Sequence, residues 1–252
     1  MATGETEHSR FNGSLLIGWD GECLHWVAAS PDAEVIDHGK EEELAALDVL
    51  AQRFPEANAV RLSLLRPVCS LIPSAVSTGI ESNVLALQHG PKTETFASKS
   101  FHSERLGEDV ALIESGHWVE EDVFLKAFPM AQWTSATLGA IEAGLQSARR
   151  DGWDSSVHID VGEKRALMMH FRGDTLRWCS VTEDLAGDGI LYHVVNALHR
   201  DGVELENARC HVVFTGVPDE RMLSQFRRFF ASVERGLHVE LGSTALLMHA
   251  RT

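Results

Sequence analysis

The chain has 252 residues, of which 44% are hydrophobic and 23% charged, so it can bury a core and is not a disordered protein. Its 37 acidic and 22 basic side chains give a formal charge of −15, which argues against a surface for nucleic acid or anionic membranes. No apolar run reaches the roughly 18 residues of a spanning helix, so we expect no membrane insertion. The polar N-terminus lacks a signal peptide and the cysteines are widely spaced. We therefore expect a cytoplasmic protein with reduced thiols.

The first part of the chain predicts three strands, a helix and a fourth strand. A polar leader at 1–12 is expected to be disordered. Apolar runs on both sides of Asp20 and Gly21 predict a tight hairpin, because Asp-Gly is a favoured hairpin turn. The predicted elements are strands at 15–19, 23–28 and 35–38, an amphipathic helix at 40–54, and a buried strand at 59–65. In that helix, Glu41, Glu42 and Glu43 are expected in the first turn, where the helix dipole favours acids.

The middle of the chain is less regular and ends in a long helix. Its predicted elements are strands at 70–73, 94–101 and 109–113, a short helix at 78–87, and a helix at 120–128. Residues 134–150 then predict a helix that carries Leu138, Ile141 and Leu145 on one stripe. We expect this helix to join two halves of the molecule.

The second half repeats the order of the first. Its predicted elements are strands at 157–161, 166–171 and 176–181, a helix at 187–200, a strand at 211–215, a helix at 219–233 and a strand at 237–241. Each half thus begins strand–strand–strand–helix–strand, which indicates a duplication. We predict an α/β protein with mixed sheets and two lobes, at 13–133 and 134–252.

Known catalytic and metal-binding motifs are missing. The chain contains no nucleophile elbow, no lysine-containing phosphate loop, no zinc-protease pair and no dinucleotide fingerprint. The 13 histidines are scattered, and His193 and His199 lie six apart on nearly opposite faces of one predicted helix. We therefore predict no catalytic residue and no metal ligand.

Aspartate and glycine residues at equivalent turns of the two halves have a functional interpretation. Asp20 and Gly21 lie in the hairpin of the first half, and Asp160 and Gly162 lie in that of the second half. Gly216 follows a strand and precedes a helix. The alternative for both aspartates is a structural role, because aspartate favours tight turns.

This arrangement resembles the actin-like ATPases, a superfamily that includes sugar kinases, heat-shock chaperones and actin and has a duplicated, ribonuclease H-like fold. The order of elements matches over residues 13–241. In that superfamily, aspartate-containing hairpins of two lobes hold phosphates and Mg²⁺. The resemblance makes 160–162 the second phosphate motif and Thr215-Gly216 the adenosine motif.

A second resemblance is closer. Residues 71–73, 188–198 and 213–216, taken in order, resemble an uncharacterised Bacteroidota family, a domain of unknown function related to the pilus-assembly protein PilM and the division protein FtsA. The family has no established activity. Because PilM and FtsA bind a short peptide or helix of a partner, the resemblance implies an unknown protein or peptide partner.

The sequence departs from a working nucleotide site at three points. Glu22 and Glu163 bring carboxylates to the turns where phosphate oxygens would lie, and like charges in a cleft repel strongly. After Gly216, Val217-Pro218 replaces further glycine and removes a backbone N–H. We therefore expect a degenerate cleft without a bound cofactor, in a pseudo-ATPase that acts as a protein-binding or assembly module. Its vestigial cofactor-binding residues are Asp20, Gly21, Asp160, Gly162 and Gly216.

Two further functions stay open. The chain is alternatively an active Mg-ATP-dependent ATPase or small-molecule kinase that uses Asp20 and Asp160, and it is alternatively a module that self-assembles into homo-oligomers. The apolar segments 237–241 and 245–248 form either a partner-binding surface or a final core strand. Arginine outnumbers lysine 17 to 5 among many acids, which resembles adaptation to a salty cytoplasm.

Overall fold

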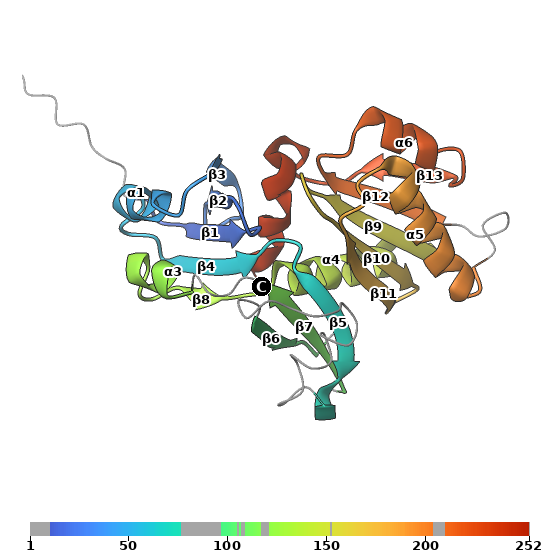
Figure 1. The fold of residues 1–252 in the computed structure, drawn as a ribbon, viewed down its shortest axis with the longest axis horizontal. Coiled ribbons are helices and arrows are strands. Elements are labelled where there is room, and N and C mark those ends of the chain that lie inside the picture. Colours follow the sequence, from blue (N-terminus) through green and yellow to red (C-terminus); the bar gives the residue numbers. More distant parts are fainter. Residues whose placement is uncertain are drawn as a thin grey trace, which may run out of the picture.

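The computed structural model describes residues 11–76, 97–104, 106, 109–116, 121–151, 153–203 and 210–251. The leader predicted at 1–12 lies outside these residues except for its last two positions, and the helix predicted at 78–87 lies wholly outside them. Within the described residues, the strands form two five-stranded sheets and one three-stranded sheet (Figure 1). The predicted mixed α/β architecture is confirmed.

The first sheet has the strand order β3-β2-β1-β4-β8. Its elements are β1 (Ser14–Trp19), β2 (Leu24–Ala29), β3 (Val35–Glu41), α1 (Ala46–Arg53), β4 (Ala59–Leu64) and β8 (Gln132–Trp133). The meander β1–β3 is antiparallel, whereas β4 joins β1 in parallel after the crossover helix α1. With α1 and α3 (Glu121–Ala127), this sheet forms the N-terminal lobe, whose core contains Leu15, Ile17 and Leu62.

The second sheet repeats this topology, with the order β11-β10-β9-β12-β13. Its elements are β9 (Ser155–Val161), β10 (Ala166–Arg172), β11 (Thr175–Thr182), α5 (Gly187–Arg200), β12 (Cys210–Gly216), α6 (Glu220–Phe226) and β13 (Ser232–Arg235). An antiparallel meander, a crossover helix and a parallel central strand again follow one another. This sheet, α5 and α6 form the C-terminal lobe, and the predicted duplication is confirmed.

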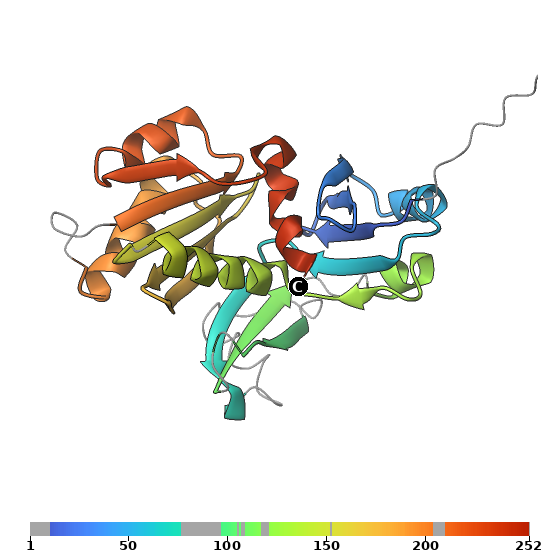
Figure 2. The ribbon, with the colours of Figure 1, turned by 180° about the vertical axis from the view of Figure 1, so that it is seen from behind.

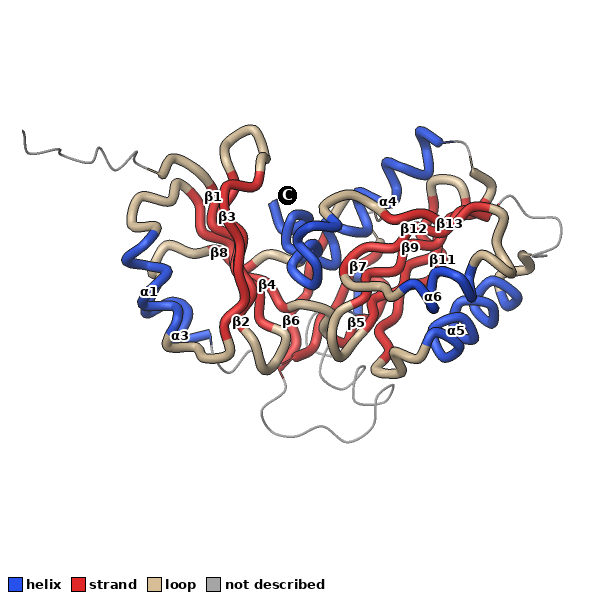
Figure 3. The backbone as a smooth tube through the Cα atoms, turned by 90° about the horizontal axis from the view of Figure 1, so that it is seen from above, coloured by secondary structure: helices blue, strands red, loops and turns tan. Residues whose placement is uncertain are grey.

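A third sheet and a long helix lie between the two lobes in the chain. The third sheet is antiparallel, with β5 (Val68–Pro73), β6 (Ala97–His102) and β7 (Val110–Gly116), and a short 3₁₀ helix at Ser74–Val76 follows β5. Helix α4 (Ala136–Asp151) packs against the second sheet, on the side opposite α5 (Figure 3). No described helix is long and apolar enough to cross a membrane.

Two predicted helix boundaries are wrong. The helix predicted at 40–54 begins at Ala46, because Lys40 and Glu41 extend β3. The three glutamates therefore precede this helix, and Asp48 is the acid in its first turn. The helix predicted at 219–233 ends at Phe226, after which Ser232–Arg235 forms the edge strand β13.

The predicted last strand at 237–241 is also wrong, because Val239–Arg251 is a kinked 3₁₀ segment, here called the C-terminal segment. It lies between the two lobes in both views (Figures 1 and 2) and contacts β1, β12 and α4. Leu246 and Leu247 are at most 1% exposed, in one core cluster with residues of both lobes. Of the two alternatives for the tail, core packing is therefore observed for 245–248.

Candidate functional site: the junction between the lobes

The β1–β2 and β9–β10 turns are structurally equivalent. Each has four residues, 20–23 and 162–165, closed by a backbone hydrogen bond from the first residue to the carbonyl of the fourth. Trp19 pairs with Leu64 at the end of β4, as Val161 pairs with Gly216 at the end of β12. By this register Asp20 corresponds to Gly162, and Asp160 corresponds to Gly18.

The expected symmetry of the two aspartates is therefore wrong by two residues. Asp160 lies within β9, whereas Asp20 lies in the turn itself. The position equivalent to Asp160 is Gly18, where an added Cβ would lie 2.7 Å from Leu247 Cδ2 and 2.8 Å from Leu65 Cγ. The N-terminal lobe thus has no carboxylate at this position and no room for one.

Asp20 stabilises its own turn. Its Oδ1 accepts hydrogen bonds from the backbone N–H groups of Glu22 (2.9 Å) and Cys23 (2.7 Å), and its Oδ2 lies 2.9 Å from His25 Nε2. Partial burial raises the pKa of Asp20, but the hydrogen bonds from His25 and the turn outweigh it and lower the pKa to about 2. Its two oxygens are therefore engaged locally, and Gly21 supplies the positive φ of 101° that the turn needs.

Asp160 instead links the two lobes. It is 2% exposed, and its Oδ1 accepts a hydrogen bond of 2.7 Å from Thr215 Oγ1 of β12. Its Oδ2 lies 2.6 Å from Nη2 of Arg66, which follows β4 in the N-terminal lobe. The predicted carboxylate of the second phosphate motif is thus paired with a buried cation.

Arg66 is the central side chain of this junction. It is 3% exposed, and besides Asp160 it donates to the carbonyl oxygen of Ser243 in the C-terminal segment, at 3.0 Å. Its guanidinium lies against the backbone of Gly162, where an added Cβ would be 2.7 Å from Nη1. Arg66 has a positive φ of 49°, a conformation that costs a non-glycine residue about 1–3 kcal/mol and persists only where surrounding contacts impose it.

Two exposed ion pairs connect the turns at the surface of the junction. Lys40 Nζ of β3 lies 2.5 Å from Glu163 Oε2, and Lys164 forms an ion pair with Glu22. The two glutamates expected to repel phosphate are therefore each paired with a lysine of the opposite lobe. Glu22 and Lys164 occupy equivalent positions of the two turns, so this pair connects the lobes across their approximate symmetry.

Gly216 lies at the same end of the second sheet as Asp160 and Gly162. It has a positive φ of 77°, and an added Cβ would lie 2.0 Å from the carbonyl oxygen of Val161. That carbonyl accepts a hydrogen bond of 2.8 Å from Val217 N. Close approach of β12 to β9 therefore requires glycine at 216, whether or not an adenosine binds beside it.

Sequence reasoning missed Arg66 and the C-terminal segment. Arg66 was detectable as the single charge in the otherwise apolar or small stretch 62–72, although nothing local indicates its partner. The apolar character of the tail is visible in the sequence, but its position between the lobes depends on tertiary contacts. Among the described residues, no three His, Cys, Asp or Glu side chains come together as metal ligands.

No protein-family model matches the chain, and neither does any curated protein sequence. Among solved structures, a Bacteroides thetaiotaomicron protein of unknown function with an actin-like ATPase fold matches with a TM-score of 0.77. The match covers 95% of this chain and 96% of that chain, at 12% sequence identity. This chain has the actin-like ATPase fold.

Two structures, one from a pilus biogenesis system and one from a secretion system, share the fold more distantly. A PilM–PilN type IV pilus biogenesis complex matches with a TM-score of 0.58 at 11% identity, over 95% of this chain and 98% of that chain. The cytoplasmic domain of EpsL, an inner membrane component of the type II secretion system of Vibrio cholerae, matches with a TM-score of 0.54 at 13% identity, over 95% and 94%. At these identities the likeness establishes the actin-like fold alone.

Proposed function

We propose that this protein is an actin-like-fold pseudo-ATPase that acts as a protein-binding or assembly module, distantly related to the Bacteroides protein and to PilM. The observation that carries the proposal is the occupation of the junction by the chain itself. Arg66 lies against Gly162 and neutralises Asp160, and the C-terminal segment packs between the lobes. Phosphates bound at such turns need free backbone N–H groups converging on them, in a space open to the ligand.

The carboxylates at the junction support the same proposal. Mg²⁺ is held by carboxylates that leave room for water and phosphate oxygens. Asp20 is engaged by its own turn and His25, and Asp160 is engaged by Arg66 and Thr215. Gly18, the equivalent of Asp160 in the N-terminal lobe, offers no carboxylate. An active Mg-ATP enzyme would have to displace Arg66 from a buried ion pair before a metal could reach Asp160.

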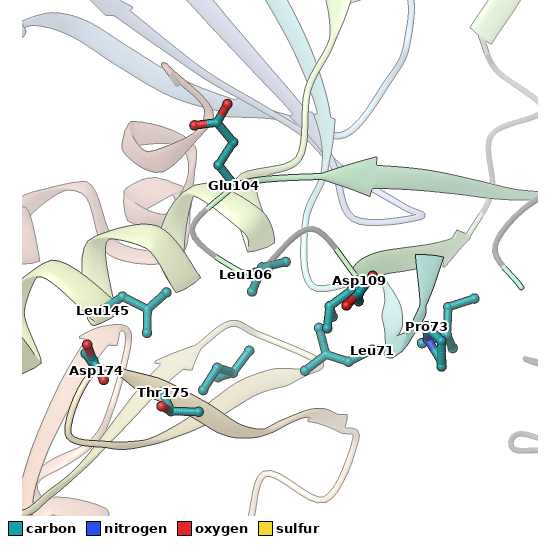
Figure 4. Close-up of a pocket in the computed structure, with 11 residues that line it drawn as sticks. Leu71, Pro73, Glu104, Leu106, Asp109, Leu145, Asp174 and Thr175 are labelled. Carbon is teal, nitrogen blue, oxygen red and sulfur yellow. The ribbon is translucent and has the colours of Figure 1, made fainter. Parts of the chain in front are cut away.

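Two of the proteins with a similar fold support the proposal that this chain binds a protein partner. The PilM structure contains PilN, and EpsL is a component of a secretion system. For the present chain, we infer that the partner binds a groove of about 500 Å³ between the third sheet, α4 and the β10–β11 turn. Figure 4 shows Leu71, Leu106 and Leu145 around this groove.

The rim of the groove indicates the chemistry of the partner. Asp109 and Asp174 are exposed at its edges, and Glu104 lies further away with its carboxylate directed away from the leucines (Figure 4). An apolar floor with acidic edges, on a chain of charge −15, favours a peptide with apolar anchors and basic flanks. The partner segment is therefore expected to be basic and amphipathic.

Fluorescence anisotropy with two labelled peptides tests this function. One peptide places leucine at helical spacing among lysines, and the other replaces every lysine with glutamate. We expect only the lysine peptide to bind, and Asp109→Asn to weaken it more than the matched control Asp32→Asn, which changes an exposed acid on another surface. Equal binding of both peptides, or equal loss in both variants, would contradict the proposal.

The enzymatic alternative is tested by phosphate release from Mg-ATP. We expect no release above that of buffer, because neither aspartate is free to hold the metal. Hydrolysis that is lost in Asp160→Asn would instead support the ATPase or kinase that uses Asp20 and Asp160.

A further inference from the structure

A second hollow, here called the outer pocket, lies on the C-terminal lobe between α5 and the strands β10 and β11. Its volume is about 330 Å³, which lies within the range of small-molecule sites. Helix α5 contributes His193, Asn196 and Arg200, which follow helical spacing on one face. The strands contribute His170, Arg177 and Trp178. Helix α5 lies on the side of the second sheet opposite α4 (Figure 3), and α4 lines the groove of Figure 4, so the two hollows lie on opposite sides of this sheet.

The outer pocket is basic in a strongly acidic protein. Arg177 and Arg200 line it, and Asp201 is the only acid among the described residues that line it. Arg172 is adjacent and donates to the backbone carbonyl of Asp201 at 3.1 Å. Arg200 is exposed and forms no ion pair with a described residue. This local excess of guanidinium groups fits an anionic ligand, because guanidinium binds phosphate and carboxylate groups well.

A β-bulge places one of these arginines. His170 of β10 pairs with Trp178 of β11, and Phe171 pairs with Leu176, so Arg177 is the extra residue of the bulged strand. Its Nε and Nη2 donate to Asp201 Oδ1 at 2.8 and 2.6 Å. Bulges redirect side chains and are over-represented next to functional sites. The bulge thus places Arg177 at the pocket, and its hydrogen bonds to Asp201 hold it there.

Two buried polar atoms in the lining of the pocket have no hydrogen-bond partner in the described part of the chain. His170 is fully buried, and its Nε2 lies 2.7 Å from Ser155 Oγ. Burial lowers the pKa of His170 to about 4, so the ring is neutral, and with Nε2 accepting from Ser155 the proton is assigned to Nδ1. Among the described residues, this Nδ1 has no hydrogen-bond partner, and it lies 3.9 Å from Asp201 Oδ2, which has none there either.

The spacing of these atoms fits a bridging hydroxyl group. A hydroxyl oxygen about 2.8 Å from each atom would accept from His170 Nδ1 and donate to Asp201 Oδ2. Asp201 caps the C-terminus of α5, where the helix dipole disfavours a negative charge. The hydrogen bonds from Arg177 to Oδ1 outweigh this effect and lower the pKa of Asp201, so the group is a carboxylate whose Oδ2 can accept from a ligand.

We propose that the outer pocket binds a small hydroxylated anion of the sugar-phosphate class, with its phosphate at Arg200 and Arg177 and a hydroxyl between His170 and Asp201. The site is independent of the proposed partner groove and of the junction between the lobes. Its ligand is recognised by two chemical groups at once, so neither a neutral sugar nor inorganic phosphate reproduces the full interaction.

Isothermal titration calorimetry on the full chain tests the proposal. The probes are ribose 5-phosphate, glucose 6-phosphate and glycerol 3-phosphate, with ribose and inorganic phosphate as fragments. We expect at least one sugar phosphate or polyol phosphate to bind about tenfold more tightly than either fragment. Absence of binding by all three phosphate esters would overturn the proposal. Inorganic phosphate binding as tightly as the esters would overturn the hydroxyl contact and, with it, the assigned ligand class.

Matched variants locate the binding site. Arg200→Gln removes an exposed charge from the pocket and is expected to weaken binding about tenfold, whereas Arg228→Gln makes the same change on another surface and leaves binding intact. Ala197→Leu fills the pocket from α5 and is expected to abolish binding. Binding that is unchanged in both Arg200→Gln and Ala197→Leu would place the ligand elsewhere and overturn the proposal.

Discussion

The two equivalent turns of the duplicated sheets differ in what their neighbouring aspartates contact. Asp20 binds backbone N–H groups and a histidine within five residues of its own position. Asp160 accepts a hydrogen bond from Thr215 of the neighbouring strand β12 and forms an ion pair with Arg66 of the opposite lobe. Duplication has thus preserved the backbone of the turn while the side chains diverged. One turn is stabilised locally, and the other connects the lobes.

Removing the C-terminal segment, which both lobes share, has the largest expected effect. Truncation after Gly242 deletes Leu246 and Leu247, and each buried leucine contributes about 2–5 kcal/mol. With the other buried residues of the segment, the lost free energy approaches the total free energy of unfolding of a typical protein, about 5–15 kcal/mol. We expect the truncated chain to lose cooperative thermal unfolding. In the full chain, Leu247→Ala lowers stability strongly and the exposed control Leu237→Ala barely does. A truncated chain with an unchanged melting curve would contradict the core position of the segment.

Breaking the buried ion pair has the next largest effect. Arg66→Met leaves Asp160 buried without its cation, which costs about 3–5 kcal/mol. The matched control is Arg53→Met, whose ion pair with Asp37 is exposed and contributes little. Urea unfolding measures both variants. A loss in Arg66→Met no larger than that in Arg53→Met would show that Asp160 does not depend on the opposite lobe.

Asp20 is expected to stabilise the protein at neutral pH and to lose this contribution in acid. Its folded pKa of about 2 lies below the ordinary value of 3.8, so its contribution is complete above pH 3.8 and is lost as the pH falls through about 2. Asp20→Asn keeps an oxygen for the turn but cannot titrate, so its melting temperature is expected to fall less steeply between pH 4 and 2. Parallel pH profiles for the two proteins would show that this carboxylate does not contribute.

The exposed pair between the turns has the smallest expected effect. Lys164→Gln removes the partner of Glu22, but both side chains are more than half exposed and solvent screens their attraction. We expect a slight fall in melting temperature at low salt that disappears at high salt. A large fall that persists in high salt would mean that the surface pair, rather than Arg66, connects the lobes.

The order of elements was predictable from the sequence, whereas the register and the junction were not. Apolar alternation around Asp20-Gly21 identifies a hairpin, and the order of strands and helix identifies the duplication. Element order does not determine register, so the sequence pattern pairs Asp20 with Asp160, whereas the structural counterpart of Asp20 is Gly162. An apolar tail has no periodicity specific to a strand, and its 3₁₀ form follows from packing between the lobes. The pairing of Arg66 with Asp160 joins distant parts of the chain, so no local pattern indicates it.

Thermal melting with Mg-ATP tests the central claim, that the chain itself occupies the junction between the lobes. The Ala197→Leu protein, whose outer pocket is filled, is used so that this pocket does not contribute. A ligand at 100 times its dissociation constant would stabilise the protein by about 2.7 kcal/mol. We predict an unchanged melting temperature at millimolar Mg-ATP. A clear rise in melting temperature that requires both Mg²⁺ and Asp160 would contradict the account.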